Sequence, residues 1–269
     1  MSAAPGAKIG SGRAAEVFEY GPGRIIKLMR DPAHRPDREV AGQQAARAAG
    51  IPTPEVFGTT IIEGRAGIIM ERIEGLDGLT AASRKPWRVW AVGRATGRVH
   101  RQLSGVPAPD GLRDLRALVE ERIGTSDTIP EAARERLKAI LALAPDGDRL
   151  CHLDLHPGNI IESPAGPVVI DFSNAASGHP MADHARSLLT FDTGEPADDT
   201  PRHEQLLIAA GRGIARRGYQ SGYGPVDREA LARWLPLMVA LRLGERIPQE
   251  RTRLLRALSR SLRAAEALS

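Results

Sequence analysis

The sequence has little cysteine, few aromatic residues and no long apolar run, and each shortage excludes a class of protein. The single cysteine, Cys151, cannot close an internal disulfide or complete a multi-cysteine zinc site, and it favours a reducing, cytoplasmic location. No stretch reaches the roughly 18 apolar residues of a membrane-spanning helix, so no membrane association is expected. Aromatic residues form only 4% of the 269 residues, too few for the stacking platforms of single-stranded nucleic-acid binders.

Lysine is also scarce, although the chain is basic. The formal net charge is +4, and only 4 of the 37 lysine and arginine residues are lysines. Residues 205–269 carry 12 arginines against 5 acids, among apolar residues at helical spacing. We interpret this segment as arginine-rich helix surface, and nucleic acid is therefore not an expected partner.

The composition and the apolar pattern predict a soluble α+β protein that begins with a small antiparallel β lobe. Hydrophobic residues make up 42% of the chain, which suits a packed core. Apolar runs indicate strands at residues 17–20, 24–29, 56–60 and 67–71, and a helix is expected over residues 36–49. We predict an N-lobe of residues 1–74 that contains these strands and this one helix.

Residues 75–269 are predicted to form a larger, mainly helical C-lobe. Trp90, Ala95, Val99 and Leu103 form an apolar stripe at helical spacing, and helical patterns fill most of residues 202–267. The helical region is interrupted by short apolar runs bounded by glycine and proline, which predict strands at residues 150–153, 160–162 and 168–171. The C-lobe should therefore contain one small inserted hairpin.

The strongest chemical motif lies on that hairpin. It reads H-x-D-x-x-x-x-N, from His152 through Asp154 to Asn159, and a second apolar run leads to Asp171. Phosphoryl transfer needs a carboxylate that orients the attacking hydroxyl and accepts its proton, which suits Asp154. It also needs oxygen ligands for Mg²⁺, which suit Asn159 and Asp171. The chain has only two asparagines, so a chance placement of one of them at this spacing is rare.

The N-lobe carries three further candidates. Gly10, Ser11 and Gly12 form a short pattern typical of a glycine-rich loop that covers phosphates. Lys27 lies among strand-forming apolar residues, in a chain that otherwise uses arginine, which indicates a site for a compact ammonium. Glu39 on the following helix is placed to pair with it. A plain hairpin turn, an edge-strand lysine and a solvated acid at a helix start are the alternative interpretations.

Together these residues resemble the aminoglycoside phosphotransferase family, small-molecule kinases of the protein-kinase-like fold that are related to choline-type kinases. The resemblance extends from Gly10 to about residue 245 and rests on residues 10–17, Lys27, Glu39 and residues 50–54, 69–75, 152–159 and 171–183. It implies a bilobal fold, ATP as the phosphoryl donor with GTP not excluded, Mg²⁺, and a small-molecule hydroxyl acceptor that is an antibiotic or a metabolite.

The resemblance also implies a role for each matching residue. Asp154 would be the catalytic base, and Asn159 and Asp171 would hold Mg²⁺. Lys27 would contact the α- and β-phosphates, oriented by Glu39.

Two further segments acquire roles by the same resemblance. The backbone of a hinge that includes Met70, Glu71 and Ile73 would meet adenine, and Asp183 matches a structural aspartate. The segment 171–173 lacks the glycine of a protein-kinase activation segment, and no long activation loop follows it. We therefore expect a small acceptor rather than a protein partner.

The charge near the expected acceptor side gives mixed signals. Residues 192–199 contain four acids, which would attract a cationic acceptor, whereas the arginine-rich segment 205–269 would repel a polycation. These signals lead to the hypothesis of a mono-cationic or neutral hydroxyl compound. A solvated loop is the alternative interpretation of the acids.

Two other functions remain open at this stage. A metal-dependent hydrolase would use His152, Asp154 and His156 as ligands, because zinc sites employ histidine and aspartate at such short spacings. A pseudokinase would bind nucleotide without turnover. The hydrolase reading leaves Lys27 and Asn159 without a role, and a pseudokinase usually lacks one of the catalytic residues found in this chain.

Overall fold

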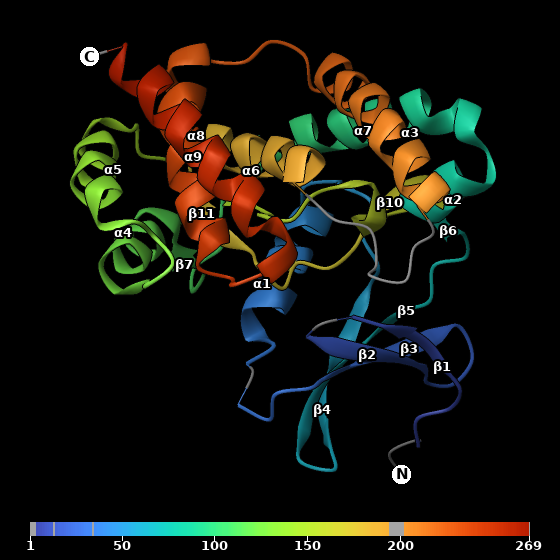
Figure 1. Cartoon of the computed structure of the whole chain (residues 1–269). Helices are drawn as coiled ribbons and strands as arrows, with labels where there is room; N and C mark the ends of the chain where they lie inside the picture. The colour runs from blue at the N-terminus through green and yellow to red at the C-terminus, as the bar shows by residue number, and fades with distance from the viewer. Residues whose placement is uncertain (1–3, 13, 34, 194–201, 269) are drawn as a thin grey trace.

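The computed structural model describes residues 4–12, 14–33, 35–193 and 202–268, and it places a sheet-containing lobe beside a mainly helical one (Figure 1). The acids at positions 195, 198 and 199, and the side chains of Leu206 and Leu207, lie outside the described residues. The helices gather on one side of the molecule, and the N-terminal strands form the other (Figure 1).

The N-lobe is built on one five-stranded antiparallel sheet in the order β1-β2-β3-β5-β4. Its elements are β1 (Lys8–Ser11), β2 (Ala15–Glu19), β3 (Arg24–Met29), α1 (Asp37–Ala48), β4 (Val56–Ile62) and β5 (Arg65–Glu71). Gly21 and Gly23 have φ of 82° and 66° in the β2–β3 turn, a region that glycine enters without steric cost. The predicted small antiparallel lobe with one helix is confirmed.

The C-lobe contains the remaining helices and two small sheets. The helices are α2 (Gly78–Arg84), α3 (Val89–Leu103), α4 (Leu115–Thr125), α5 (Glu131–Leu143), α6 (Pro180–Thr193), α7 (Arg202–Tyr223), α8 (Arg228–Leu243) and α9 (Arg251–Glu266). One sheet has the order β10-β9-β6, and its strands are β6 (Leu76–Asp77), β9 (Ile160–Ser163) and β10 (Gly166–Val169). The other has the order β7-β11-β8, and its strands are β7 (Arg113–Asp114), β8 (Arg149–Cys151) and β11 (Ala176–Gly178).

The inserted hairpin forms as predicted, but its neighbouring strands differ from the expectation. β9 and β10 pair with each other, whereas the run at residues 150–153 contributes only β8, which pairs with β11. β10 ends at Val169, two residues before Asp171. Asp171 has a φ of 65°, and this left-handed conformation cannot continue a strand.

The apolar stripe predicted for α3 is only partly correct. Val99 and Leu103 are buried, but Trp90 is 43% exposed. Helical spacing places a residue on a face, but that face is covered only where a neighbouring element packs on it. Trp87, just before α3, is exposed as well.

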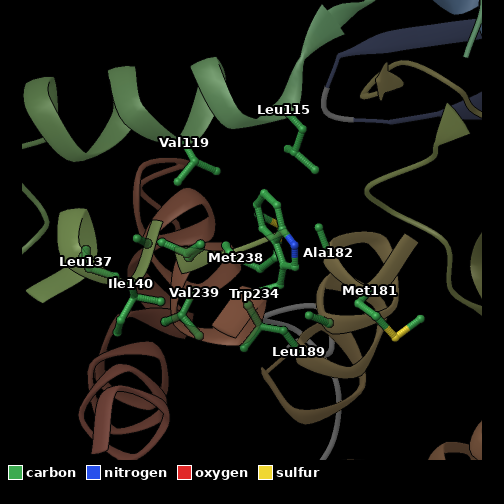
Figure 2. Packing of buried hydrophobic residues seen from close by; sticks show 14 of the residues in the cluster. Leu115, Val119, Leu137, Ile140, Met181, Ala182, Leu189, Trp234, Met238 and Val239 are labelled. Atoms are coloured by element: carbon green, nitrogen blue, oxygen red, sulfur yellow. The ribbon is translucent and has the colours of Figure 1, made fainter. Parts of the chain in front are cut away.

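The largest hydrophobic core of the C-lobe surrounds α8. Trp234 on this helix is 1% exposed and lies among Leu115, Val119 and Ala182 from α4 and α6 (Figure 2). Burying large apolar side chains is the main favourable term in folding. This packing fixes α6 against α8, and α6 follows the segment of Asp171 in the chain.

Glycines let α3 and α7 pack at backbone contact. A Cβ added at Gly97 of α3 would lie 2.1 Å from the carbonyl oxygen of Tyr219, and one added at Gly222 of α7 would lie 2.1 Å from that of Arg94. Gly213, also on α7, has no heavy atom within 4 Å of an added Cβ. The same helix therefore contains glycines that the packing requires and one that it does not.

We expect Gly222→Ala to destabilise the protein by about 1–3 kcal/mol, because a backbone carbonyl cannot move aside without displacing α3. Gly213→Ala is the matched control and should be neutral or stabilising by up to about 1 kcal/mol, since alanine favours helix. Urea-unfolding midpoints of the two variants measure the difference. Equal stabilities would contradict the close packing of α3 on α7.

Candidate active site

Asp154 lies on a loop whose backbone is held from behind by Asp183. The N–H groups of His152 and Leu153 donate to the two carboxylate oxygens of Asp183, each at 2.8 Å. Leu153 has a φ of 60°, a conformation that costs a leucine about 1–2 kcal/mol and persists only where the surroundings enforce it. The side chain of Asp154 is 27% exposed, so the loop presents its carboxylate to a ligand.

The two histidines of the motif hydrogen-bond to the backbone of this part of the chain. His152 is buried, its Nε2 lies 3.0 Å from the carbonyl of Ile170, and its Nδ1 accepts from the N–H of Asp154. His156 accepts from the N–H of Gly158 through Nδ1 and lies 4.0 Å from Asp154 through Nε2. Both rings therefore brace the loop.

Asn159 turns its amide nitrogen toward Asp154 and so orients its oxygen elsewhere. Nδ2 donates to the backbone carbonyl of Asp154 at 2.8 Å and lies 3.4 Å from its Oδ2. Asp171 is half-exposed and uses Oδ1 to accept from Lys27. Neither the amide oxygen of Asn159 nor Oδ2 of Asp171 takes part in these bonds. Both are hard oxygen donors, so the residues present fit Mg²⁺.

Lys27 joins the two lobes. From β3 its ammonium donates to Glu39 on α1 at 2.6 Å and to Asp171 of the C-lobe at 2.7 Å. Helix α1 packs closely on the C-lobe, since a Cβ added at Gly42 would lie 3.0 Å from Ala175. The pairing of Lys27 with Glu39 forms as the sequence suggested. The contact with Asp171 was not foreseen, because these residues are 144 positions apart.

The charges of this triad determine its protonation. Burial acts to lower the pKa of Lys27, but Glu39 and Asp171 outweigh it and raise the pKa above the ordinary value. Burial acts to raise the pKa of Asp171, but the ammonium of Lys27 lowers it to about 2. For Glu39 burial prevails and the pKa is raised. Lys27 is therefore charged and Asp171 ionised at neutral pH, the state in which a carboxylate can bind a metal ion.

The glycine-rich segment is the tip of the β1–β2 hairpin. Gly10 lies within β1 opposite Val17, and the N–H of Gly12 donates to the carbonyl of Ala15. Arg30 donates to the carbonyl of Gly12 and to the Ser11 hydroxyl. Added Cβ atoms at Gly10 and Gly12 would meet neighbours at ordinary contact distances, 3.5 and 3.7 Å. The backbone itself therefore does not require glycine at either position.

The predicted hinge follows β5, an inner strand of the same sheet. Met70 is buried in β5, and the N–H of Glu71 donates to the carbonyl of Glu55. The N–H of Arg72 donates to the carbonyl of Gly23, so it is not available to a nucleotide base. The backbone of Ile73, two residues beyond β5, is thus the next candidate for contact with a base.

A buried polar network behind Asp183 was missed by sequence reasoning. His100 on α3 lies 3.1 Å from Asp183, and its Nδ1 lies 2.7 Å from the hydroxyl of Tyr219. That hydroxyl is 3.0 Å from Nδ1 of His184. The network connects α3, α6 and α7 to the loop of Asp154. A histidine next to Val99, on the apolar stripe of α3, is the sequence signal that could have revealed it.

His184 should make the protein sensitive to acid. Burial, with a smaller contribution from the neighbouring His100, lowers its pKa from 6.5 to about 3. Below pH 6.5 the unfolded chain therefore takes up a proton that the folded protein does not, so stability is complete above 6.5 and is lost as the pH falls toward 3. We expect the free energy of unfolding to fall by up to about 1.4 kcal/mol for each pH unit in this range. Urea unfolding at several pH values measures this pH dependence. An unchanged pH dependence in His184→Gln would contradict its assignment to His184.

The histidine cluster required by the hydrolase alternative does not form. Both ring nitrogens of His152 are engaged, and Nδ1 of His179 accepts from the N–H of Met181. In the described part of the chain, no three histidine, cysteine, aspartate or glutamate side chains are grouped to hold a metal ion. The oxygen pair of Asn159 and Asp171 is the candidate metal site that the motif provides.

The antiparallel sheet lobe and the helical lobe match those of kinase-like phosphotransferase structures, and the chain has this fold. It belongs to the Phosphotransferase enzyme family, whose family model matches residues 6–234. The resemblance to aminoglycoside phosphotransferases and choline-type kinases is thereby confirmed.

Several solved structures share the fold at low sequence identity. A choline/ethanolamine kinase family protein from Mesorhizobium loti has 18% identity and a TM-score of 0.61, with 99% of this chain and 94% of that one covered. Amicoumacin kinase hAmiN, in complex with AMP-PNP, Ca²⁺ and Ami, has 15% identity and a TM-score of 0.59 over 98% and 88%. An aminoglycoside-3'-phosphotransferase of type VIII has 21% identity and a TM-score of 0.56 over 87% and 91%.

No curated protein sequence matches the chain. None of the helices in the described ranges combines the length and the apolar character needed to traverse a bilayer.

Proposed function

We propose that the protein transfers the γ-phosphoryl group of ATP to a hydroxyl group of a small molecule. The observation that carries the proposal is the convergence of Lys27, Asp154, Asn159 and Asp171, which come from β3, the loop after β8, η2 (Pro157–Asn159) and the segment after β10. Phosphoryl transfer depends mainly on positioning and on stabilisation of charge, and these residues supply both.

Asp154 is the proposed base. Its partly exposed carboxylate accepts the proton of the acceptor hydroxyl as the oxygen attacks the γ-phosphorus and ADP leaves. Asn159 holds the backbone of Asp154 in place and directs its amide oxygen toward the cation site. Bound Mg²⁺, held by Asn159 and Asp171, would neutralise charge on the phosphates.

The N-lobe is proposed to bind the nucleotide. Lys27, held by Glu39, directs its ammonium toward the α- and β-phosphates, and the lack of side chains at Gly10 and Gly12 leaves room for phosphate beside the hairpin. The hinge backbone at Met70, Glu71 and Ile73 meets the base, with ATP as the donor and GTP not excluded. These roles go with a division into a nucleotide-binding lobe of residues 1–74 and a catalytic and acceptor-binding lobe of residues 75–269.

The related structures support the nucleotide and the type of acceptor. Amicoumacin kinase hAmiN was solved with AMP-PNP, Ca²⁺ and Ami, and a streptomycin complex is known for an aminoglycoside phosphotransferase with a TM-score of 0.50. These proteins bind a nucleotide together with a small antibiotic. By analogy, the acceptor of this chain is a small hydroxyl compound, an antibiotic or a metabolite, rather than a protein or nucleic acid.

The charges around Asp154 favour an acceptor with little positive charge. Glu245 and Glu250 on this side of the C-lobe are each paired with an arginine and so offer little attraction to a polycation. We therefore propose a mono-cationic or neutral hydroxyl compound.

The test is an ADP-release screen with MgATP against aminoglycosides, other antibiotics, choline, sugars, nucleosides and hydroxy amino acids. Acceptor-dependent ADP formation that EDTA abolishes would support the proposal. A purified protein that retains stoichiometric zinc, and that hydrolyses a substrate when no phosphoryl acceptor is present, would instead support the hydrolase.

A further inference from the structure

Arg186 is a buried arginine directly behind the catalytic loop. It lies one helical turn after Asp183 on α6, and its side chain is 2% exposed. Its Nε donates to the carbonyl oxygen of Leu153 at 2.9 Å. Since Asp183 binds the N–H of Leu153, the two α6 residues together hold both backbone groups of the residue that precedes Asp154.

The guanidinium of Arg186 is in turn held by an ion-pair chain. Its Nη2 pairs with Glu245, whose other oxygen accepts from Arg242 at 2.6 Å. Arg242 is bonded to Glu250 through two parallel contacts of 2.6 and 2.7 Å. This series of ion pairs extends from the catalytic loop through α6 and the end of α8 to the 3₁₀ turn η3 (Pro248–Glu250).

The burial of these groups makes the arrangement rigid. Glu250 and Arg242 expose only 4% and 12% of their side chains, and Glu245 exposes 32%. A buried guanidinium is costly unless it is paired, so loss of one partner destabilises the position of the next. Bidentate arginine–carboxylate pairs also fix geometry, which a single ammonium does not.

Arg242, in the middle of this series of ion pairs, also interacts electrostatically with the catalytic loop. Burial acts to lower the pKa of Arg242, but Glu250, Glu245 and the charge of Asp154 raise it. Burial lowers the pKa of His156, and the positive charge of Arg242 adds to that effect. Arg242 is therefore within electrostatic reach of the base and of the histidine beside it.

We infer that Arg186 is a positioning residue for the base: with Glu245, Arg242 and Glu250 it locks the carbonyl of Leu153 and thereby the orientation of Asp154. Leu153 is left-handed, and without a bond to its carbonyl the peptide that leads into Asp154 can rotate. The inference rests on the proposed role of Asp154 as base. It gives a catalytic consequence to an ion-pair network that does not touch the nucleotide or the acceptor.

The test measures kcat, KM for MgATP and nucleotide Kd in Arg186→Met, Arg186→Lys and Glu245→Gln. We expect Arg186→Met and Glu245→Gln to lower kcat about tenfold or more, since small misplacements of reacting groups carry such penalties. KM for MgATP and nucleotide Kd should stay within about twofold, because the N-lobe contacts are intact. Arg186→Lys keeps the charge and one donor, so it should recover part of kcat.

Arg134→Lys is the matched control. Arg134 also holds backbone carbonyls, those of Ile123 and Ser126, but it does so between α5 and α4, away from the catalytic loop. Arg134→Lys should lower the melting temperature without lowering kcat. A purely structural role of Arg186 would instead make kcat follow stability in every variant.

The outcomes separate this inference from the proposed function. If Asp154→Ala keeps turnover in the same assay, the proposed function fails. If Asp154→Ala abolishes turnover but the folded Glu245→Gln and Arg186 variants keep kcat within twofold of wild type, only the positioning inference is overturned. Glu245 is partly exposed and its variant retains the Arg186 side chain in the sequence, so Glu245→Gln decides the question if Arg186→Met does not fold.

Discussion

Asp154→Ala is expected to lower kcat by about 10²–10⁴-fold while the affinity for MgATP changes by less than about threefold. The carboxylate is proposed to act on the acceptor hydroxyl and not on the nucleotide. The bond from Asn159 goes to the backbone carbonyl of Asp154, so it survives the substitution and keeps the proposed cation site intact. Steady-state kinetics with the best acceptor, together with calorimetric titration of nucleotide, measure the two effects separately.

Asp148→Ala is the matched control for this experiment. Asp148 lies just before β8, has a side chain that is 82% exposed and pairs only loosely with Arg149, at 3.3 Å. It should leave both kcat and nucleotide affinity unchanged. Turnover within tenfold of wild type in Asp154→Ala would remove Asp154 from the role of base.

Lys27→Arg is expected to lower kcat/KM for MgATP by about 10²-fold although the charge is retained. The ammonium of Lys27 lies within 2.6 Å of Glu39 and 2.7 Å of Asp171, with a side chain only 11% exposed. A planar guanidinium is wider than this position allows and would displace α1 or Asp171. Kinetics at varied MgATP, with circular dichroism to establish folding, measure the loss.

Lys8→Arg provides the matched control for Lys27→Arg. Lys8 is also a lysine on a strand of the same sheet paired with a glutamate, Glu16 at 2.8 Å, but it is 46% exposed. This substitution should be silent. Glu39→Gln should show a weaker form of the Lys27 defect, because it removes the charge but keeps an acceptor for the ammonium. Full activity of Lys27→Arg would make Lys27 an ordinary cation and would contradict its proposed contact with phosphates.

The local parts of the site could be predicted from the sequence because their chemistry depends on short spacing. The motif from His152 to Asn159 spans one loop, and Lys27 is marked by its apolar neighbours in a chain that favours arginine. The sheet lobe and the hairpin follow from alternating apolar runs and glycine turns. Elements of two or three residues, such as β6 and β7, carry no periodicity, so the sequence contained no signal for them.

The long-range contacts could not be predicted in the same way. Arg186 is separated from Leu153 by 33 positions and from Glu245 by 59, and nothing local distinguishes it among 33 arginines. The burial of Trp90 was also misjudged, because amphipathic spacing does not tell which face receives a partner. The roles assigned to the site residues remain predictions that the variants above test.

The most direct measurement of the central claim is transfer of the terminal phosphate of ATP to an acceptor by the purified wild-type protein. Each compound of the acceptor panel is incubated with MgATP, and the product is examined by ³¹P NMR alongside ADP release. The account predicts a new phosphate monoester on a hydroxyl oxygen of the acceptor, formed in step with ADP and absent in Asp154→Ala. Nucleotide binding without transfer to any compound of the panel, or a monoester that forms equally well without Asp154, would contradict it.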